Sequence, residues 1–92
     1  MLDIFYSSQF KKDYKRMKKQ GKSVELLLDV VEILAGEGAL DPKYQDHALA
    51  GGYIGHRECH IQPDWLLIYK IDGGQLLLTL TRTGTHSELF RK

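Results

Sequence analysis

Cysteine, proline and long apolar runs are scarce in this chain. Its 92 residues include one cysteine, Cys59, and two prolines. A single cysteine cannot form a disulfide within the chain, which suits a reducing compartment. No apolar run approaches the roughly 20 residues of a membrane-spanning helix, and the N-terminus lacks the basic-then-apolar order of a signal peptide. These absences predict a cytoplasmic protein without a membrane segment.

The sequence also lacks the common signatures of metal and nucleophile sites. No CxxC, HExxH or GxSxG pattern occurs,. His56, Cys59 and His60 are of the residue types that bind zinc, but in a strand Cys59 would lie on the face opposite the two histidines. We therefore expect no metal site and no cofactor.

What the sequence contains is typical of one small globular domain. Hydrophobic residues make up 42% and charged residues 27% of the chain,. A chain of this length can form a single core, and no repeat or linker divides it. Residues 1–92 are expected to fold as one domain.

Positive charge is concentrated near the N-terminus. Residues 11–22 contain seven basic residues and one acid, which gives +6, while the rest of the chain carries −5. Such a run is either a solvated helix face or a surface for a polyanion such as RNA or an acidic protein.

The hydrophobic pattern predicts an α+β fold. A short strand at "DIFYS" precedes a helix that is capped by Ser7 or Ser8 and runs to about Gln20,. Ser23 caps a second helix, "VELLLDVVEILA", and an irregular connection follows over residues 37–55,. Three strands, "GHRECHIQ", "WLLIYKI" and "QLLLTLTRT", then form an antiparallel meander with helices on one face and the other face open,.

Alternation along the strands sorts the side chains by face. In "GHRECHIQ" His56, Glu58 and His60 share one face, which is poor material for a core,. In the last strand the same alternation predicts that Leu80 and Arg82 share a face, with Thr81 and Thr83 on the opposite one.

Four histidines in the second half of the chain could converge on the open face. Metal-free RNA cleavage needs a base for the 2′-hydroxyl, an acid for the 5′-oxygen and a cation for the phosphate. Histidine suits both proton transfers near neutral pH. His47, His56, His60 and His86 are the candidates, and Arg82 could hold the phosphate,.

Asp64 and Trp65 admit two interpretations each. Trp65 is either a tryptophan at the edge of the core or a platform on which a base stacks,. Asp64 either forms an ordinary turn after Pro63, or acts in the site by orienting a histidine or holding a nucleotide hydroxyl. The residues alone predict a basic α+β domain with a possible nucleic-acid surface.

Three segments together resemble a known family. "DHALAG", "HIQPDWLLIYK" and "RTGTHSELF" resemble the YafQ branch of the RelE-type toxins of bacterial toxin-antitoxin pairs. The resemblance covers essentially the whole chain and implies the RelE-like microbial RNase fold: a short strand, two helices, a three-stranded antiparallel meander and a short C-terminal turn or helix.

The resemblance implies a ribosome-dependent mRNA interferase that cuts the codon in the ribosomal A site without a metal. The family pattern makes His47, His60, Asp64 and His86 catalytic candidates, with His86 as general acid, and Arg82 the phosphate-stabilising cation. Trp65 and Phe90 would contact or frame the mRNA. His56 stands where the family pattern leads us to expect an aromatic residue such as tyrosine, and we include it as a further substrate-binding candidate.

The resemblance also implies partners. The basic helix would dock on ribosomal RNA through Lys11, Lys12, Lys15, Arg16, Lys18 and Lys19,. A cognate antitoxin would block the site, and the complex of both proteins would bind operator DNA. Two alternatives stay open on the same scaffold: a ParE-like toxin that inhibits DNA gyrase, and a catalytically inactive binding member.

Overall fold

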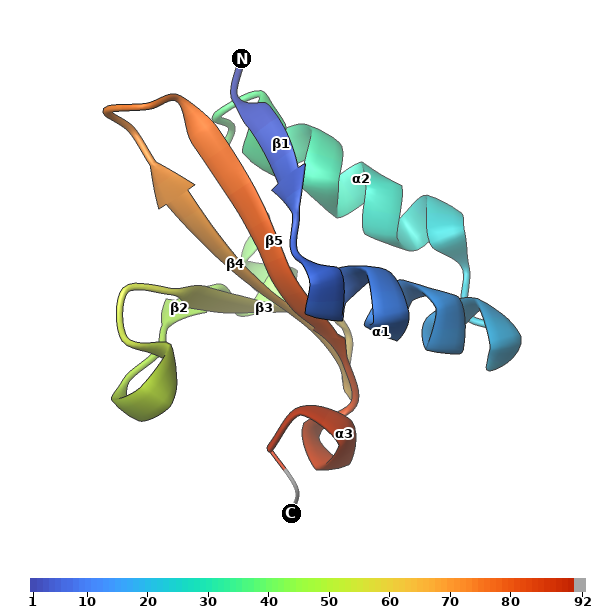
Figure 1. Cartoon of the computed structure of the whole chain (residues 1–92). Helices are drawn as coiled ribbons and strands as arrows, with labels where there is room; N and C mark the ends of the chain where they lie inside the picture. The colour runs from blue at the N-terminus through green and yellow to red at the C-terminus, as the bar shows by residue number, and fades with distance from the viewer. Residues whose placement is uncertain (91–92) are drawn as a thin grey trace.

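The computed structural model describes residues 1–90, in which five strands form one sheet (Figure 1). The strand order is β1-β5-β4-β3-β2. β1 pairs with β5 in parallel, and the other neighbours are antiparallel. The strands are β1 Asp3–Tyr6, β2 His47–Ala48, β3 Arg57–Gln62, β4 Trp65–Asp72 and β5 Leu77–Gly84. The predicted α+β class and meander are confirmed.

Helices α1 Ser8–Lys19 and α2 Val24–Ala35 both cover one face of this sheet, and a short helix, α3 His86–Phe90, follows β5 (Figure 1). α1 begins at the predicted cap, because the Ser7 hydroxyl accepts a hydrogen bond of 2.9 Å from the Phe10 amide,. No helix within residues 1–90 is long and apolar enough to cross a membrane.

The main core lies between the sheet and these two helices. Phe10 and Met17 of α1 and Leu27 of α2 are buried there against Leu67 and Leu78 of the sheet. A second, smaller cluster occupies the other face, where Leu66 and Ile68 contact Leu89 of α3. The cluster leaves part of that face uncovered, and the polar groups described below are found there.

The predicted loop before β3 is more ordered than its sequence indicates. Residues 37–55 contain two single 3-10 turns, Pro42–Tyr44 and Gly51–Tyr53, and the two-residue strand β2 between them. β2 pairs with β3, with His47 opposite Glu58. This short pairing fixes the position of His47, which the sequence placed in an irregular connection.

A β-bulge at Thr81 overturns the predicted faces of β5. Tyr69 of β4 lies opposite Leu80, whereas the preceding Ile68 lies opposite Arg82, so one extra residue is inserted in β5,. Directly opposed residues share a face, and Arg82 therefore lies on the Ile68 side rather than with Leu80. The bulge moves Thr83 to the helix-covered side, where it is fully buried.

Trp65 is part of the core, so its predicted role as an exposed stacking platform for RNA is wrong. Its side chain is 1% exposed. The indole Nε1–H donates a 2.9 Å hydrogen bond to Thr83 Oγ1, which in turn donates to the carbonyl oxygen of Leu66 at 2.8 Å. The bulge that buries Thr83 thus supplies the polar partner that a buried indole needs.

Replacing Trp65 by phenylalanine is expected to lower the free energy of unfolding by at least about 1 kcal/mol, because the indole–Thr83 hydrogen bond is lost,. Urea unfolding followed by far-ultraviolet circular dichroism measures the change. Fluorescence cannot serve, since Trp65 is the single tryptophan of the chain. An unchanged unfolding midpoint would contradict the structural role assigned to the indole.

Candidate active site

Three of the four histidines converge on the uncovered face of the sheet. His47 comes from β2, His60 from β3 and His86 from the start of α3. The ring centroids of His60 and His86 are 5.6 Å apart, and those of His47 and His60 are 6.2 Å apart. His60 therefore lies between the other two, as the alternation along β3 and the C-terminal turn together predict.

His47 is held by two hydrogen bonds. Its Nε2 lies 2.8 Å from Oε2 of Glu58, and its Nδ1 lies 2.8 Å from the carbonyl oxygen of Gln45. Both partners only accept, so the two bonds form together only when the ring is protonated and positively charged. Each ring nitrogen of His47 therefore lies against an oxygen of the protein, which fixes the position of the ring.

His60 keeps one ring nitrogen available. Its Nδ1 lies 3.3 Å from the carbonyl oxygen of Pro63, which can only accept a hydrogen bond. A proton on Nδ1 leaves a lone pair on Nε2 of the neutral ring. That is the form a general base requires.

His86 is oriented by Asp64. Oδ1 of Asp64 accepts from the backbone N–H of His86 at 3.0 Å and lies 2.7 Å from its Nδ1. The backbone hydrogen bond and then the side-chain bond lower the pKa of Asp64, so its carboxylate stays ionised beside the imidazole,. Of the two interpretations of Asp64, this geometry favours the one in which it orients a histidine.

A capping box starts the helix that carries His86. The Thr85 hydroxyl accepts from the Glu88 amide at 3.1 Å, and Glu88 Oε1 accepts from the Thr85 amide at 2.8 Å,. Glu88 also reaches α1, where its Oε2 lies 3.1 Å from Nε of Arg16. Gly84 permits this close approach, since a Cβ there would lie 2.9 Å from Glu88 Oε1.

The Asp64–His86 contact is expected to be lost only in strong acid. A carboxylate whose pKa is lowered by folding adds stability above its ordinary pKa, and that contribution disappears as the pH falls through the lowered value,. The His86 amide signal in ¹H–¹⁵N NMR should therefore show an acid transition with a midpoint below 3.8. Asp64→Asn should remove this transition, whereas a midpoint at or above 3.8 in the parent would contradict the contact.

Arg82 forms an ion pair with Asp13, a residue to which the sequence analysis gave no role. Its Nε and Nη2 donate to Asp13 of α1 at 2.7 and 3.1 Å. Asp13 is 1% exposed and also accepts from the Thr83 amide at 3.2 Å and from Arg16 at 3.0 Å. The bonds to Asp13 and a contact with Tyr53 raise the pKa of Arg82, and its charge is held in a fixed position.

Glu58 is the main site residue without an assigned role in the sequence analysis, although strand alternation placed it on the same face as His60. It is 5% exposed. One carboxylate oxygen binds His47, but Oε1 is buried and has no hydrogen-bond partner within residues 1–90. Buried carboxylate oxygens normally have partners, so this oxygen marks an incomplete polar site.

The two remaining substrate-binding candidates border the site on the side of the small cluster. The Tyr53 ring packs edge-on against His56 and Phe90, with centroids 5.8 and 6.0 Å away. The Nδ1 of His56 is buried and has no hydrogen-bond partner within residues 1–90. His56 is therefore packed against an aromatic ring, although alternation places it on the same strand face as His60.

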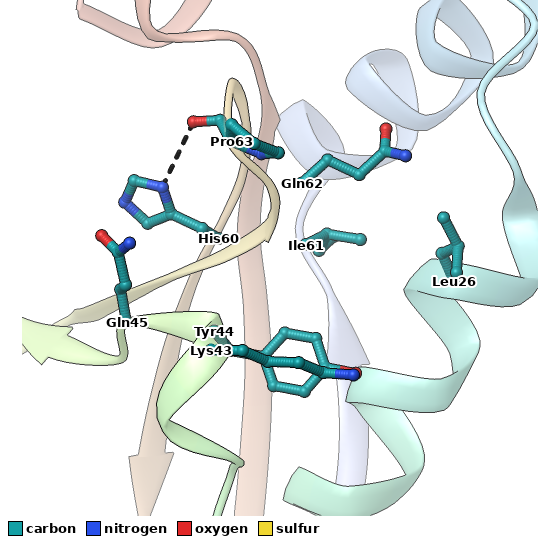
Figure 2. A pocket seen from close by; sticks show the side chains of 8 residues that line it. All are labelled: Leu26, Lys43, Tyr44, Gln45, His60, Ile61, Gln62 and Pro63. Atoms are coloured by element: carbon teal, nitrogen blue, oxygen red, sulfur yellow. Dashed lines mark hydrogen bonds between the residues drawn. The ribbon is translucent and has the colours of Figure 1, made fainter.

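A pocket of about 460 Å³ adjoins His60 (Figure 2). Tyr44 and Lys43 form one wall, and Gln45 and Gln62 contribute amide groups to its lining. Aromatic, cationic and amide groups in one cavity are suited to a nucleotide. The pocket therefore extends the histidine site in the direction of α2.

The predicted ribosome-binding residues of α1 divide into two kinds. Five of the side chains are exposed: Lys11, Lys12, Lys15, Lys18 and Lys19. Arg16 differs, because its guanidinium forms ion pairs with Asp13 of the same helix and with Glu88, and the second pair fastens α1 to α3. The free positive charge of the helix is carried by lysines.

The same fold occurs in bacterial toxins. The structure of a metal-bound toxin from Helicobacter pylori is 50% identical, with a TM-score of 0.92, over 98% of this chain and 100% of that one. YafQ in the Escherichia coli DinJ-YafQ complex is 41% identical, with a TM-score of 0.89, over 98% of this chain and 99% of that one. These likenesses place the chain in the class of small bacterial toxins.

Sequence comparison names the family within that class. The mRNA interferase toxin YafQ of Escherichia coli (strain K12) is 42% identical over 89 residues, which are 96% of this chain and 95% of that protein. Residues 2–91 match the family described as bacterial toxin of type II toxin-antitoxin system, YafQ. The chain belongs to the YafQ family of type II toxins, as the resemblance of its three segments predicted.

Proposed function

We propose that this protein is an endoribonuclease that cuts mRNA on the ribosome and thereby stops translation. The observation that carries the proposal is the pair of His60 and His86, which face each other on one open surface with their rings 5.6 Å apart. An acid and a base at that separation can flank one phosphodiester. The names of the similar interferase toxins support the same reaction class.

In the proposed reaction Nε2 of His60 removes the proton of the ribose 2′-hydroxyl. The 2′-oxygen attacks phosphorus, the bond between phosphorus and the 5′-oxygen breaks, and the 5′-oxygen takes a proton from Nε2 of His86. The products are a 2′,3′-cyclic phosphate and a 5′-hydroxyl. Asp64 stabilises the protonated ring of His86 through Nδ1, at 2.7 Å, and holds it in position,.

Two cations would stabilise the negative charge that develops on the phosphate. Nε and Nη2 of Arg82 donate hydrogen bonds to Asp13, and Nη1 takes no part in these two bonds. His47, when protonated, adds a second positive charge beside His60,. Both groups are preorganised by protein partners, so little reorganisation is needed when the charge appears.

The surroundings of the histidines would position the RNA. A nucleotide next to the scissile phosphate would occupy the pocket beside His60, where Tyr44 provides a ring and Lys43 a charge,. Phe90, from α3, would frame the strand on the other side. The site needs no metal for these steps, since proton transfer and charge stabilisation come from the side chains.

The positive charge of α1 and the family together indicate the binding partners of the protein. The exposed lysines of α1 would bind ribosomal RNA, in a manner weakened by salt. A cognate antitoxin would inhibit the protein, as the DinJ-YafQ complex suggests, and the pair would reach operator DNA only through the complex. This reaction would take place in the cytoplasm.

Mapping of RNA ends tests the proposal. Primer extension on messages from cells that express the protein alone should show cuts within reading frames. Purified protein should cut an mRNA engaged with ribosomes faster than the same free mRNA. Intact messages accompanied by DNA damage of the gyrase type would favour the ParE-like alternative, and neither effect would favour a binding member.

A further inference from the structure

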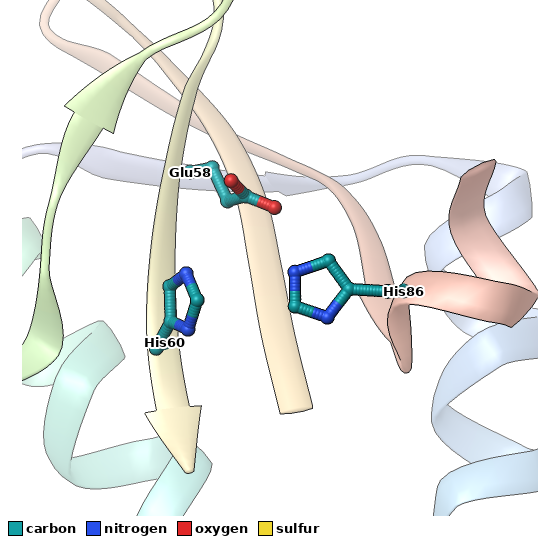
Figure 3. Close-up of side chains that lie close together, drawn as sticks. All are labelled: Glu58, His60 and His86. Carbon is teal, nitrogen blue, oxygen red and sulfur yellow. The ribbon is translucent and has the colours of Figure 1, made fainter. Parts of the chain in front are cut away.

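The uncovered face of the sheet holds three potential metal ligands, and the proposed cleavage does not use them to bind a metal. Glu58, His60 and His86 each offer one ligand atom, and these three atoms lie within 4.8 Å of one another (Figure 3). We infer that this cluster binds a zinc ion, and that zinc bound there inhibits the protein by occupying both of its proton-transfer nitrogens.

The free oxygen of Glu58 is an independent sign of a ligand. Its side chain is 7% exposed, and Oε1 has no hydrogen-bond partner within residues 1–90. Figure 3 shows the carboxylate on the strand beside the two imidazoles. A buried carboxyl oxygen without a partner costs free energy, and a cation between it and the two rings would remove that cost.

The hydrogen bonds of the two rings leave the right atoms for a cation. Nδ1 of His60 is directed to the carbonyl oxygen of Pro63, and Nδ1 of His86 is directed to Asp64. Nε2 is the remaining ligand atom in each ring. An imidazole whose other nitrogen donates to a carbonyl or carboxylate is the usual state of a metal-bound histidine.

Glu58 has the same kind of support. Its Oε2 is held by Nε2 of His47 at 2.8 Å while Oε1 is left for the metal. His47 would therefore orient the carboxylate without binding the ion itself.

The donor set favours zinc over magnesium or calcium. Two imidazole nitrogens with one carboxylate oxygen are typical zinc ligands, and a fourth position is left for water. Tetrahedral ligand atoms at zinc bond lengths are roughly 3.4 Å apart, and the three atoms here lie within 4.8 Å of one another, so a small movement would complete the site. His86 can make this movement, because its side chain is 48% exposed and lies on a short helix.

Zinc in this position would stop the proposed reaction. A lone pair that binds zinc can neither accept a proton, as His60 must, nor carry one, as His86 must. The effect on activity rests on the proposed function, whereas the binding itself does not. The test accordingly measures binding and cleavage separately.

Binding is measured by titrating zinc chloride into the purified full-length protein in a calorimeter, with no RNA present. One ion per chain is expected, and the ring ¹⁵N signals of His60 and His86 should shift. Glu58→Gln and His86→Gln should each weaken binding by more than about tenfold. The matched control is Glu32→Gln, which changes an exposed glutamate on α2 and should bind zinc as the parent does.

His86→Gln keeps the binding test valid if Glu58→Gln fails to fold, since His86 is on the surface. Parent-like zinc binding in His86→Gln would overturn the site. Cleavage of ribosome-bound mRNA should fall on zinc addition and return when a zinc-selective chelator is added. Zinc that binds to the cluster without changing cleavage would overturn the proposed inhibition. Zinc-free protein that does not cut RNA would overturn the proposed function, and calorimetry would still test the zinc site independently.

Discussion

Replacing His86 by alanine is expected to reduce mRNA cleavage by about 10² to 10⁴-fold, the usual contribution of a general acid. The side chain is 48% exposed and makes its hydrogen bond to Asp64 on the surface, so its loss should leave the core intact. Single-turnover cleavage of a ribosome-bound message measures the change. The pH profile of the residual activity should also lose its basic limb, because the group that must be protonated is gone.

The control for this experiment is Lys70→Ala, which alters an exposed residue of β4 opposite Thr79, toward the hairpin end of the sheet. That variant should cleave at the parent rate. Circular dichroism of both variants verifies the fold. A parent-like cleavage rate in His86→Ala would remove His86 from the mechanism and leave His60 and His47 to be tested in its place.

Replacing Asp13 by alanine is expected to lower the free energy of unfolding by about 3 kcal/mol. The change deprives Arg82 of two hydrogen bonds and the buried Thr83 amide of one. Breaking a buried ion pair typically costs roughly 3 to 5 kcal/mol, and the lower end applies because the Arg82 side chain is 16% exposed,. The shift of the urea midpoint at unchanged slope measures the effect.

Asp29→Ala is the matched control, since it removes an exposed aspartate from α2. It should change stability by no more than about 0.5 kcal/mol. Equal effects of the two substitutions would show that the Asp13–Arg82 pair does not hold α1 to β5. Cleavage at a temperature well below the unfolding transition should also fall in Asp13→Ala, because Arg82 loses the partner that aims it.

Local patterns predicted much of the fold. The hairpin at Asp72 was signalled by its glycines, and the Asp72 side chain accepts hydrogen bonds from the Gly74 and Gln75 amides in the turn. Alternation along β3 correctly separated His60 and Glu58 from Cys59, which is buried on the helix side. Burial raises the pKa of the Cys59 thiol to about 12, so it is not a thiolate ligand near neutral pH,.

The wrongly predicted faces of β5 have one cause, which is the bulge at Thr81. Period-two alternation holds only while the ladder is regular, and one inserted residue exchanges the faces of everything beyond it. Arg82 and Thr83 were therefore assigned to the wrong sides of the sheet. The hydrogen bond from the buried Trp65 indole to Thr83 could not be predicted for the same reason. Nothing in "LTLTRTG" identifies the extra residue, because the pairing with β4 decides it.

Asp13 was overlooked for a different reason. In the sequence it is a single acid within a basic helix, and its partner Arg82 is 69 residues away. Such a contact arises only when α1 is laid across the end of β5. The capping box of "THSE", by contrast, was present in the local sequence and could have predicted the start of α3 at His86.

The two halves of the catalytic pair differ in how firmly they are built into the molecule. His60 belongs to a strand paired on both sides, whereas His86 begins a helix of five residues that is attached through Leu89, Glu88 and Asp64. A single turn of helix has little stability of its own. Movement of α3 away from the sheet would separate His86 from His60 while the sheet and both long helices stay folded, so activity would be lost and regained without refolding of the domain.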